Sequence, residues 1–236
     1  MSSNAATVVL AHGAWADGSS WAKVIGSLVA EGIEVVAAPL PLTSFSDDVA
    51  ALERTLARVT GPVVLAGHAY AGAVIGATRN EKVRALVYVA ALAPDEGETV
   101  ADLFYRTAPH PQAPMLTPDE QGIIYLPRAA FAAAFAQHAT ADEQTLLAAV
   151  QRPISTACIT VAAGRPLWKD RPSWFLVAEE DRMIVPENQR FMAARMKARV
   201  RSHQVDHTPI VTAPGVVVKI IRDAVHDVAT PQAVTT

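Results

Sequence analysis

One ten-residue stretch, Val63–Gly72, constrains the fold more than any other part of the chain. It reads Val-Val-Leu-Ala-Gly-His-Ala-Tyr-Ala-Gly and passes from apolar to small residues. The apolar run suits a buried parallel strand, and the apolar residues that follow Gly72 suit a helix. A strand that turns directly into a helix needs small residues at the turn, because the two backbones come close together. The stretch therefore predicts a strand, a sharp turn and a helix.

Strand and helix patterns alternate on both sides of this stretch. Besides the Val63 strand, β-rich runs predict strands at Thr7–Ala11, Ile33–Ala38, Val83–Ala90, Ser173–Ala178 and Val200–Val205. Helical spacing separates the early strands, and the later ones are followed by predicted helices at Pro186–Met196 and Pro214–Val228. This alternation predicts an α/β fold, with a mostly parallel sheet of about six strands flanked by helices.

The alternation breaks between about residues 91 and 171. Prolines are frequent in this segment, and its alanine-rich pieces Arg128–Gln137 and Asp142–Gln151 have helical patterns. Because the strand pattern resumes afterwards, we interpret the segment as a small helical cap inserted into a single domain that spans residues 1–236.

Composition excludes several functional classes. The net charge of −3 with scattered Lys and Arg gives no basic surface for nucleic acid. No apolar run is long enough to span a membrane and the first residues do not resemble a signal peptide, so a cytoplasmic protein without a membrane partner is expected. The single cysteine, Cys158, excludes an internal disulfide and a cysteine-based zinc cluster. No metal and no cofactor are predicted.

Residues able to carry chemistry follow four of the predicted strands. They are the loop His12–Trp15, the turn at Ala69, Asp181 and His207. Ligands of open parallel sheets bind beyond the carboxyl ends of the strands, where these residues are expected to meet.

These residues lie in motifs that resemble a known family. The motifs are Val8–Trp15, the turn Gly67–Gly72, Asp181–Ile184 with Pro186, and Asp206–Pro209. Over about residues 7–227 the chain resembles the α/β-hydrolase superfamily, in particular small serine esterases related to plant hydroxynitrile lyases and methyl esterases. The order of nucleophile, acid and histidine along the chain also matches that superfamily.

The resemblance implies a role for each of these positions. The family's nucleophile falls on Ala69, its acid on Asp181 and its base on His207. The backbone N–H groups of Ala14 and Tyr70 would form the oxyanion hole. Asp181 would hold the imidazole in the right tautomer and stabilise the imidazolium.

Some of these residues also have a purely structural interpretation. His207 could lie in a surface loop, and Asp181 competes with Glu179 and Glu180 in an acidic turn. Trp15, Tyr125 and Trp168 are predicted to bind the acyl or alcohol part of a substrate, or alternatively to pack in the core.

Other polar residues near the site are expected to be structural. His12 and His68 are assigned to packing within their turns. Asp47 and Asp48 are expected to act as acids near the positive end of a helix. Cys158 has no motif around it and is expected to be a buried small residue.

The residue at position 69 decides between functions, because a methyl group cannot attack a carbonyl. The first interpretation is a carboxylic ester (or lactone) hydrolase of the serine type whose nucleophile is replaced by Ala69, inactive as written, with a small-molecule ester or related carbonyl compound as substrate. Two others stay open. One is a lyase or cofactor-free oxygenase that uses His207 and Asp181 as a base dyad, and the other is a non-catalytic protein that binds small molecules. The sequence does not indicate the oligomeric state.

Overall fold

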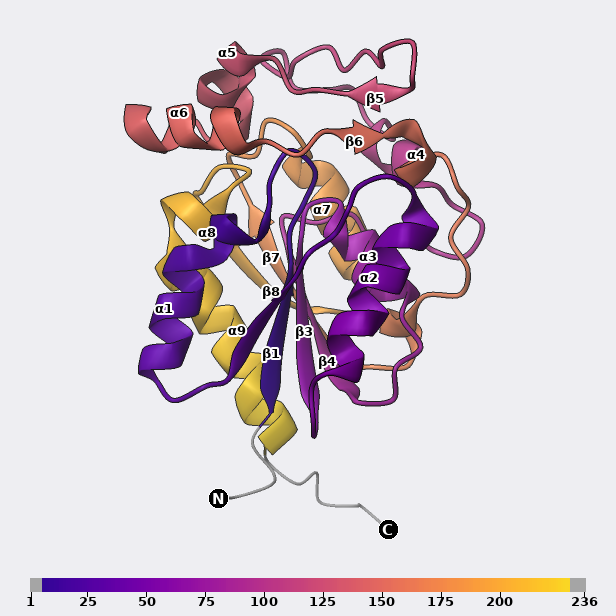
Figure 1. The fold of residues 1–236 in the computed structure, drawn as a ribbon, viewed down its shortest axis with the longest axis vertical. Coiled ribbons are helices and arrows are strands. Elements are labelled where there is room, and N and C mark those ends of the chain that lie inside the picture. The colour runs from indigo at the N-terminus through magenta and orange to yellow at the C-terminus, as the bar shows by residue number, and fades with distance from the viewer. Residues whose placement is uncertain (1–5, 230–236) are drawn as a thin grey trace.

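A parallel six-stranded sheet forms the centre of the molecule. The structure is a computed structural model and describes residues 6–229, so residues 1–5 and 230–236 of the predicted domain lie outside the described residues. The order across the sheet is β2-β1-β3-β4-β7-β8 (Figure 1). The strands are β1 (Thr7–Ala11), β2 (Val35–Ala38), β3 (Val63–His68), β4 (Val83–Val89), β7 (Ser173–Ala178) and β8 (Arg199–His203).

The position of each strand follows from its sequence. All residues of β1, β3 and β7 are buried, as expected of apolar strands covered on both faces. The edge strands β2 and β8 are only partly buried, and β8 carries Arg and His side chains. Charged side chains on an edge strand oppose pairing with another chain.

Helices cover both faces of the sheet. In Figure 1, α1 (Ala22–Ala30) and α9 (Pro214–Ala229) lie on one side of the sheet, and α2 (Phe45–Ala57) and α3 (Ala71–Ala77) lie on the other. Two further helices pack beside the sheet. The first is α7 (Pro186–Arg195), which packs on β7, and the second is the short α8 (Pro209–Thr212), which packs on α1 and α9. The predicted α/β fold class is therefore confirmed.

Two predicted strands are displaced from their observed positions. The predicted strand Ile33–Ala38 begins two residues later, at Val35, because the Ile33 N–H donates to Leu28 O and completes the end of α1. Gly32, with a φ of 80°, makes that ending possible. The last strand is Arg199–His203 and not Val200–Val205, because the Val205 N–H turns back onto His203 O.

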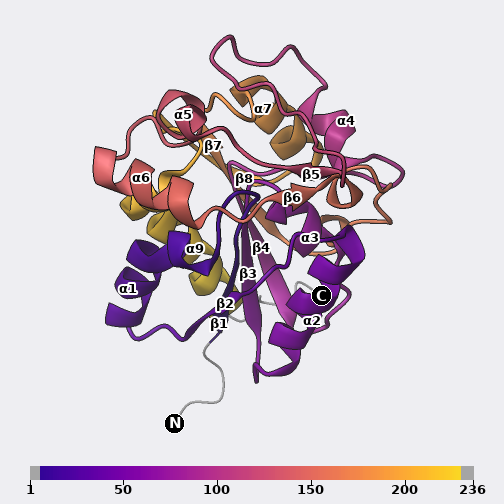
Figure 2. The same cartoon turned by 45° about the horizontal axis from the view of Figure 1, so that its top comes forward.

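The segment between β4 and β7 leaves the sheet and lies over the carboxyl ends of the strands (Figures 1 and 2). It contains α4 (Val100–Phe104), α5 (Arg128–Ala130), α6 (Ala141–Val150) and a pair of short antiparallel strands, β5 (Ile123–Ile124) and β6 (Ile154–Ser155). The strand pair was not predicted. The predicted helix Arg128–Gln137 is only partly α-helical, because residues Phe131–Phe135 form a π-helical turn in which the Ala136 N–H donates to Phe131 O.

Candidate active site

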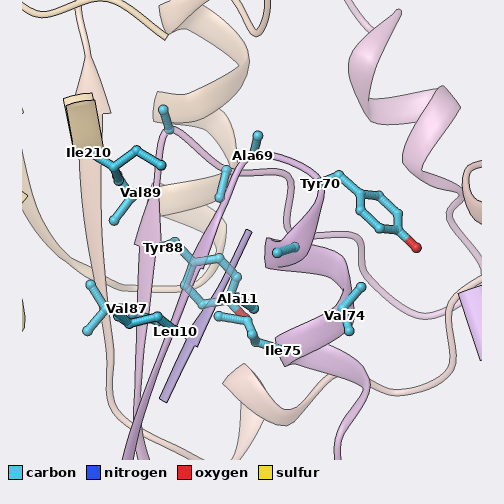
Figure 3. Packing of buried hydrophobic residues seen from close by; sticks show 14 of the residues in the cluster. Leu10, Ala11, Ala69, Tyr70, Val74, Ile75, Val87, Tyr88, Val89 and Ile210 are labelled. Carbon is cyan, nitrogen blue, oxygen red and sulfur yellow. The ribbon is translucent and has the colours of Figure 1, made fainter. Parts of the chain in front are cut away.

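The turn between β3 and α3 holds Ala69 in a strained conformation. Its φ is 50°, in the left-handed region that alanine rarely adopts. Three backbone hydrogen bonds fix it there: the Ala69 N–H donates to Val89 O, and the Ala69 carbonyl accepts from the N–H groups of Gly72 and Leu92. Figure 3 shows Ala69 at the top of this turn.

Small residues make this turn possible. A Cβ on Gly67 would lie 2.9 Å from Ala71 O, and one on Gly72 would lie 2.4 Å from Leu92 O. Neither position can hold a larger residue without moving backbone, which is the close approach that the sequence predicted.

Asp181 and His207 form a buried hydrogen-bonded pair. His207 Nδ1 lies 2.8 Å from Asp181 Oδ2, and both side chains are almost fully buried. The other carboxylate oxygen accepts from the N–H groups of Met183 and Ile184, each at 2.8 Å, and Oδ2 also accepts from Gln189 Nε2 at 2.8 Å. These donors fix the carboxylate, so Nδ1 of His207 carries the proton and Nε2 presents a lone pair.

The neighbouring acids are engaged elsewhere. Glu179 binds Arg190 and Ser202 at the surface, and Glu180 lies 2.9 Å from His138 Nε2. Asp181 is therefore the acid of this turn that contacts His207.

The loop after β1 lies directly against the turn at Ala69. A Cβ on Gly13 would be 2.9 Å from the Ala69 Cβ. His12 shapes the loop, because its Nδ1 bonds to Gly13 O at 3.0 Å and its Nε2 accepts from the Leu40 N–H at 3.1 Å. Burial lowers the pKa of His12, which fits the predicted structural role.

The N–H groups of Ala14 and Tyr70 are free to bind a ligand. Within residues 6–229 neither donates a hydrogen bond to another protein atom. Both residues line the same cavity as Ala69 and His207. Tyr70 also precedes α3 directly, so its N–H belongs to the positive end of that helix.

His68 holds the backbone of His207 through a buried hydrogen bond. It is fully buried, and its Nε2–H donates to the His207 carbonyl at 2.7 Å. Burial lowers the pKa of His68 to about 3, with a smaller contribution from the nearby His207. The sequence predicted only packing here, whereas the structure gives His68 a specific hydrogen bond to the backbone of His207.

The cavity beside these groups is almost entirely apolar. The cap and the sheet contribute side chains that enclose it: Trp15, Leu92, Val100, Phe104, Leu116, Ile124, Ile154, Ile159, Met183 and Ile184. No Lys, Arg, Asp or Glu lines it. His207 is the one histidine among the lining residues, and its Nε2 has no hydrogen-bond partner within the described residues. The cavity therefore suits an uncharged apolar compound with a polar group near His207.

Of the three predicted substrate-binding aromatics, only Trp15 lines the cavity. Its Nε1–H donates to Ile124 O at 2.9 Å, which ties it to the cap. Tyr125 is 58% exposed and outside the cavity, because adjacent side chains of an extended segment point to opposite sides and Ile124 takes the inner one. Trp168 packs in the core, where its Nε1–H donates to Pro94 O at 3.3 Å. The predictions for Tyr125 and Trp168 are thus not supported by the geometry.

One buried acid near the site makes a contact that the sequence did not indicate. Asp48 is completely buried and its Oδ2 accepts from the Tyr70 O–H at 2.7 Å. Because Asp48 lies in the first turn of α2, four residues after the capping residue Ser44, the sequence predicted only an interaction with the positive end of the helix. Only the folded chain shows that it faces Tyr70.

Two kinds of feature are not found in the described part of the chain. Among residues 6–229, no group of three or more His, Cys, Asp or Glu side chains could hold a metal ion. No helix in that part of the chain is both long and apolar enough to cross a membrane.

Comparison with known proteins identifies a family and several solved structures that are similar to this chain. The sequence profile of the alpha/beta hydrolase family matches residues 8–220. A search of curated proteins finds no match. Among solved structures, polyneuridine aldehyde esterase is similar with a TM-score of 0.81 and 19% identity, over 93% of this chain and 98% of that one.

Two further structures have nearly the same similarity. A pyrethroid hydrolase from Sphingobium faniae JZ-2 has a TM-score of 0.80 and 20% identity, over 94% of this chain and 97% of that one. Tomato methylketone synthase I, in an H243A variant complexed with β-ketoheptanoate, has a TM-score of 0.79 and 17% identity, over 95% of this chain and 99% of that one. At these identities the likeness establishes a shared fold.

Proposed function

The chain belongs to the alpha/beta hydrolase family, and we propose that its site is that of a carboxylic ester (or lactone) hydrolase in which Ala69 closes the covalent route. One observation carries the proposal. The Asp181–His207 pair presents a free Nε2 to an apolar cavity that also contains the turn at Ala69 and the open N–H groups of Ala14 and Tyr70. Base, acid and oxyanion donors are, apart from the nucleophile, the parts that acyl transfer requires.

With a serine at position 69 the reaction would proceed by acyl transfer. The hydroxyl would attack the ester carbonyl while His207 takes its proton. The N–H groups of Ala14 and Tyr70 would stabilise the oxyanion, and His207 would return the proton to the leaving alcohol. Water activated by His207 would then release the acid. Ala69 has no atom that can attack, so the protein as written forms no acyl-enzyme.

The cavity limits the substrate class. Its walls are apolar, with Trp15 in the lining and no charged side chain among the lining residues. We propose a small uncharged ester or lactone with an aliphatic or aromatic acyl group. A permanently charged substrate would lose its hydration without gaining a counter-ion in the cavity.

The test restores the nucleophile. Ala69→Ser should hydrolyse a short activated ester such as 4-nitrophenyl butyrate, and the parent protein should not. Adding His207→Ala should abolish the gain, and adding Asp181→Asn should lower kcat by about 10³- to 10⁴-fold. A folded Ala69→Ser protein without activity on a panel of esters and lactones would contradict the proposal.

A second function is favoured by the open Nε2 of His207 in a site without a nucleophile. In this case the Asp181–His207 pair acts on a carbonyl compound directly. Tomato methylketone synthase I, which shares the fold, is seen with β-ketoheptanoate. The neutral acid would give its carboxyl proton to His207 Nε2, and loss of CO₂ would then leave an enolate. The N–H groups of Ala14 and Tyr70 would stabilise the enolate oxygen while His207 returns the same proton to carbon.

This second function is tested on the parent protein. β-Ketoheptanoate is incubated with the parent and with His207→Ala, and formation of 2-hexanone is followed against the spontaneous rate. Acceleration by the parent alone would support direct dyad chemistry. Equal rates would reject it for this substrate class, and silence in both assays would favour a protein that only binds its ligand.

A further inference from the structure

A buried carboxylate joins three parts of the chain beside the candidate site. Asp48 Oδ1 accepts from the Leu42 N–H at 2.7 Å, and Oδ2 accepts from the Tyr70 O–H at 2.7 Å. The thiol of Cys158, in the cap segment, lies 3.6 Å from the same Oδ2. Asp48 forms no salt bridge with a described Lys, Arg or His, and burial raises its pKa. Hydrogen bonds are therefore its main compensation for leaving water.

Helix capping does not explain this residue. In the same turn of α2, the exposed Asp47 accepts from Thr43 Oγ1 at 2.9 Å, and its N–H donates to the Ser44 hydroxyl. Hydrogen bonds from the Ser44 and Thr43 hydroxyls to its carboxylate lower the pKa of Asp47. Asp48, in contrast, is buried and accepts a hydrogen bond from the Tyr70 hydroxyl. An apolar residue in its place would avoid the burial of a carboxylate.

Tyr70 connects this carboxylate to the turn. It follows Ala69 directly, and its side chain extends away from the sheet with the hydroxyl at the far end (Figure 3). That hydroxyl is held by Asp48, so both ends of Tyr70 are constrained: the backbone by the strained turn and the ring by α2. A shift of the ring would therefore be passed to the backbone N–H that opens to the cavity.

We propose that Asp48 is a positioning residue of the candidate active site, which aims the N–H of Tyr70 by holding the Tyr70 hydroxyl. Through Cys158, Asp48 also anchors the part of the cap that carries Ile159, a residue of the cavity wall. The inference rests on the proposed function in one respect, the use of the Tyr70 N–H as an oxyanion donor. It assigns no contact between Asp48 and the substrate.

The kinetic test compares matched variants in the Ala69→Ser background. Asp48→Asn keeps the shape but replaces one acceptor oxygen with a donor, so either the Leu42 N–H or the Tyr70 hydroxyl together with the Cys158 thiol loses its acceptor. Tyr70→Phe removes the hydroxyl and keeps the ring and the backbone N–H. Asp47→Asn changes the neighbouring acid of the same helix turn and is the control.

Asp48→Asn and Tyr70→Phe should each lower kcat by about 10- to 100-fold, because a small misplacement of a catalytic donor has effects of that size. KM should change less than about threefold, since the loss concerns the transition state. The double variant should be no slower than the slower single variant. Asp47→Asn should leave both constants unchanged.

A second measurement needs no hydrolysis and uses the parent protein with Ala69 in place. In ¹H–¹⁵N NMR spectra, Asp48→Asn should shift the Tyr70 amide signal and Asp47→Asn should not. Hexanamide, an uncharged carbonyl analogue of an acid product, should shift the amide signals of Tyr70 and Ala14. It should bind Asp48→Asn at least about tenfold more weakly than it binds the parent.

The two measurements separate the inference from the proposed function. If Ala69→Ser is inactive, the esterase proposal fails and the Tyr70 amide signal still decides the role of Asp48. If Asp48→Asn leaves kcat and that signal unchanged, the inference is overturned. Should Asp48→Asn fail to fold, Tyr70→Phe decides in its place, and an unchanged kcat and an unchanged hexanamide affinity would overturn the inference.

Discussion

The buried imidazole of His68 should make the protein sensitive to acid in a calculable way. His68 is fully buried, and its Nε2–H donates to the His207 carbonyl at 2.7 Å. Burial lowers its pKa from 6.5 to about 3. The perturbation is a decrease in pH, applied to the parent and to His68→Gln. Glutamine does not titrate, and its amide N–H can donate to the same carbonyl.

The direction of the change in stability follows from the protonation of His68 in the folded and the unfolded chain. Above pH 6.5 His68 is neutral in both the folded and the unfolded chain, and its stability contribution is fully present. As the pH falls below 6.5, the unfolded chain takes up a proton that the folded protein does not accept until about pH 3. Each unit in this window costs about 1.4 kcal/mol of the free energy of unfolding, so the loss between pH 7 and pH 4.5 is about 3 kcal/mol.

The assay is urea unfolding of both proteins at pH 7, 6, 5 and 4.5. The parent should lose about 3 kcal/mol more than His68→Gln over this range, while the other titrating groups, including the buried His12, affect both proteins alike. Two parallel curves would refute the reasoning, because they would mean that His68 takes up a proton as easily in the folded protein as in the unfolded chain.

Three further predictions concern packing. Gly72→Ala should destabilise the protein by about 3 kcal/mol, because its Cβ would lie 2.4 Å from Leu92 O; a urea midpoint like that of the parent would contradict this. Gly26→Ala in α1 should instead stabilise it by about 0.5–1 kcal/mol, because a Cβ there meets nothing within 4 Å; lower stability would be unexpected. The thiol of Cys158 is buried and burial raises its pKa to about 12, so a disulfide reagent should label it at least about 10³-fold more slowly in the native protein than in denaturant. Comparable rates would show that it is accessible.

Local patterns in the sequence were sufficient to predict the fold class. Continuous apolar runs of strand length identified β1 and β7 with their observed bounds. Glycine spacing at Gly67 and Gly72 predicted the turn on which Ala69 lies, because backbone proximity excludes side chains there whatever else surrounds it.

The pairing of Asp181 with His207 was also foreseeable. In a parallel sheet the carboxyl ends of neighbouring strands lie at one edge, so residues that follow β7 and β8 meet although 26 positions separate them. Their catalytic roles, and those of Ala14 and Tyr70, stay predictions until the variants above are measured.

What the sequence could not determine depends on contacts between distant segments. Which aromatic side chains reach the cavity depends on how the cap folds, and Tyr125 and Trp168 do not reach it. Helical spacing places Asp48, four residues before Leu52, on the buried face of α2, but it does not show which group Asp48 contacts there.

The sequence by itself thus determined the order of the strands along the chain, the sharp turn at Ala69 and the edge of the sheet at which chemistry is placed, since these follow from periodicity and local sterics. Only the tertiary structure decided which buried groups face one another. It brought Asp48 to Tyr70 across 22 positions and His68 to His207 across 139. Such pairings come from packing helices and loops into one core, and no local sequence pattern encodes them.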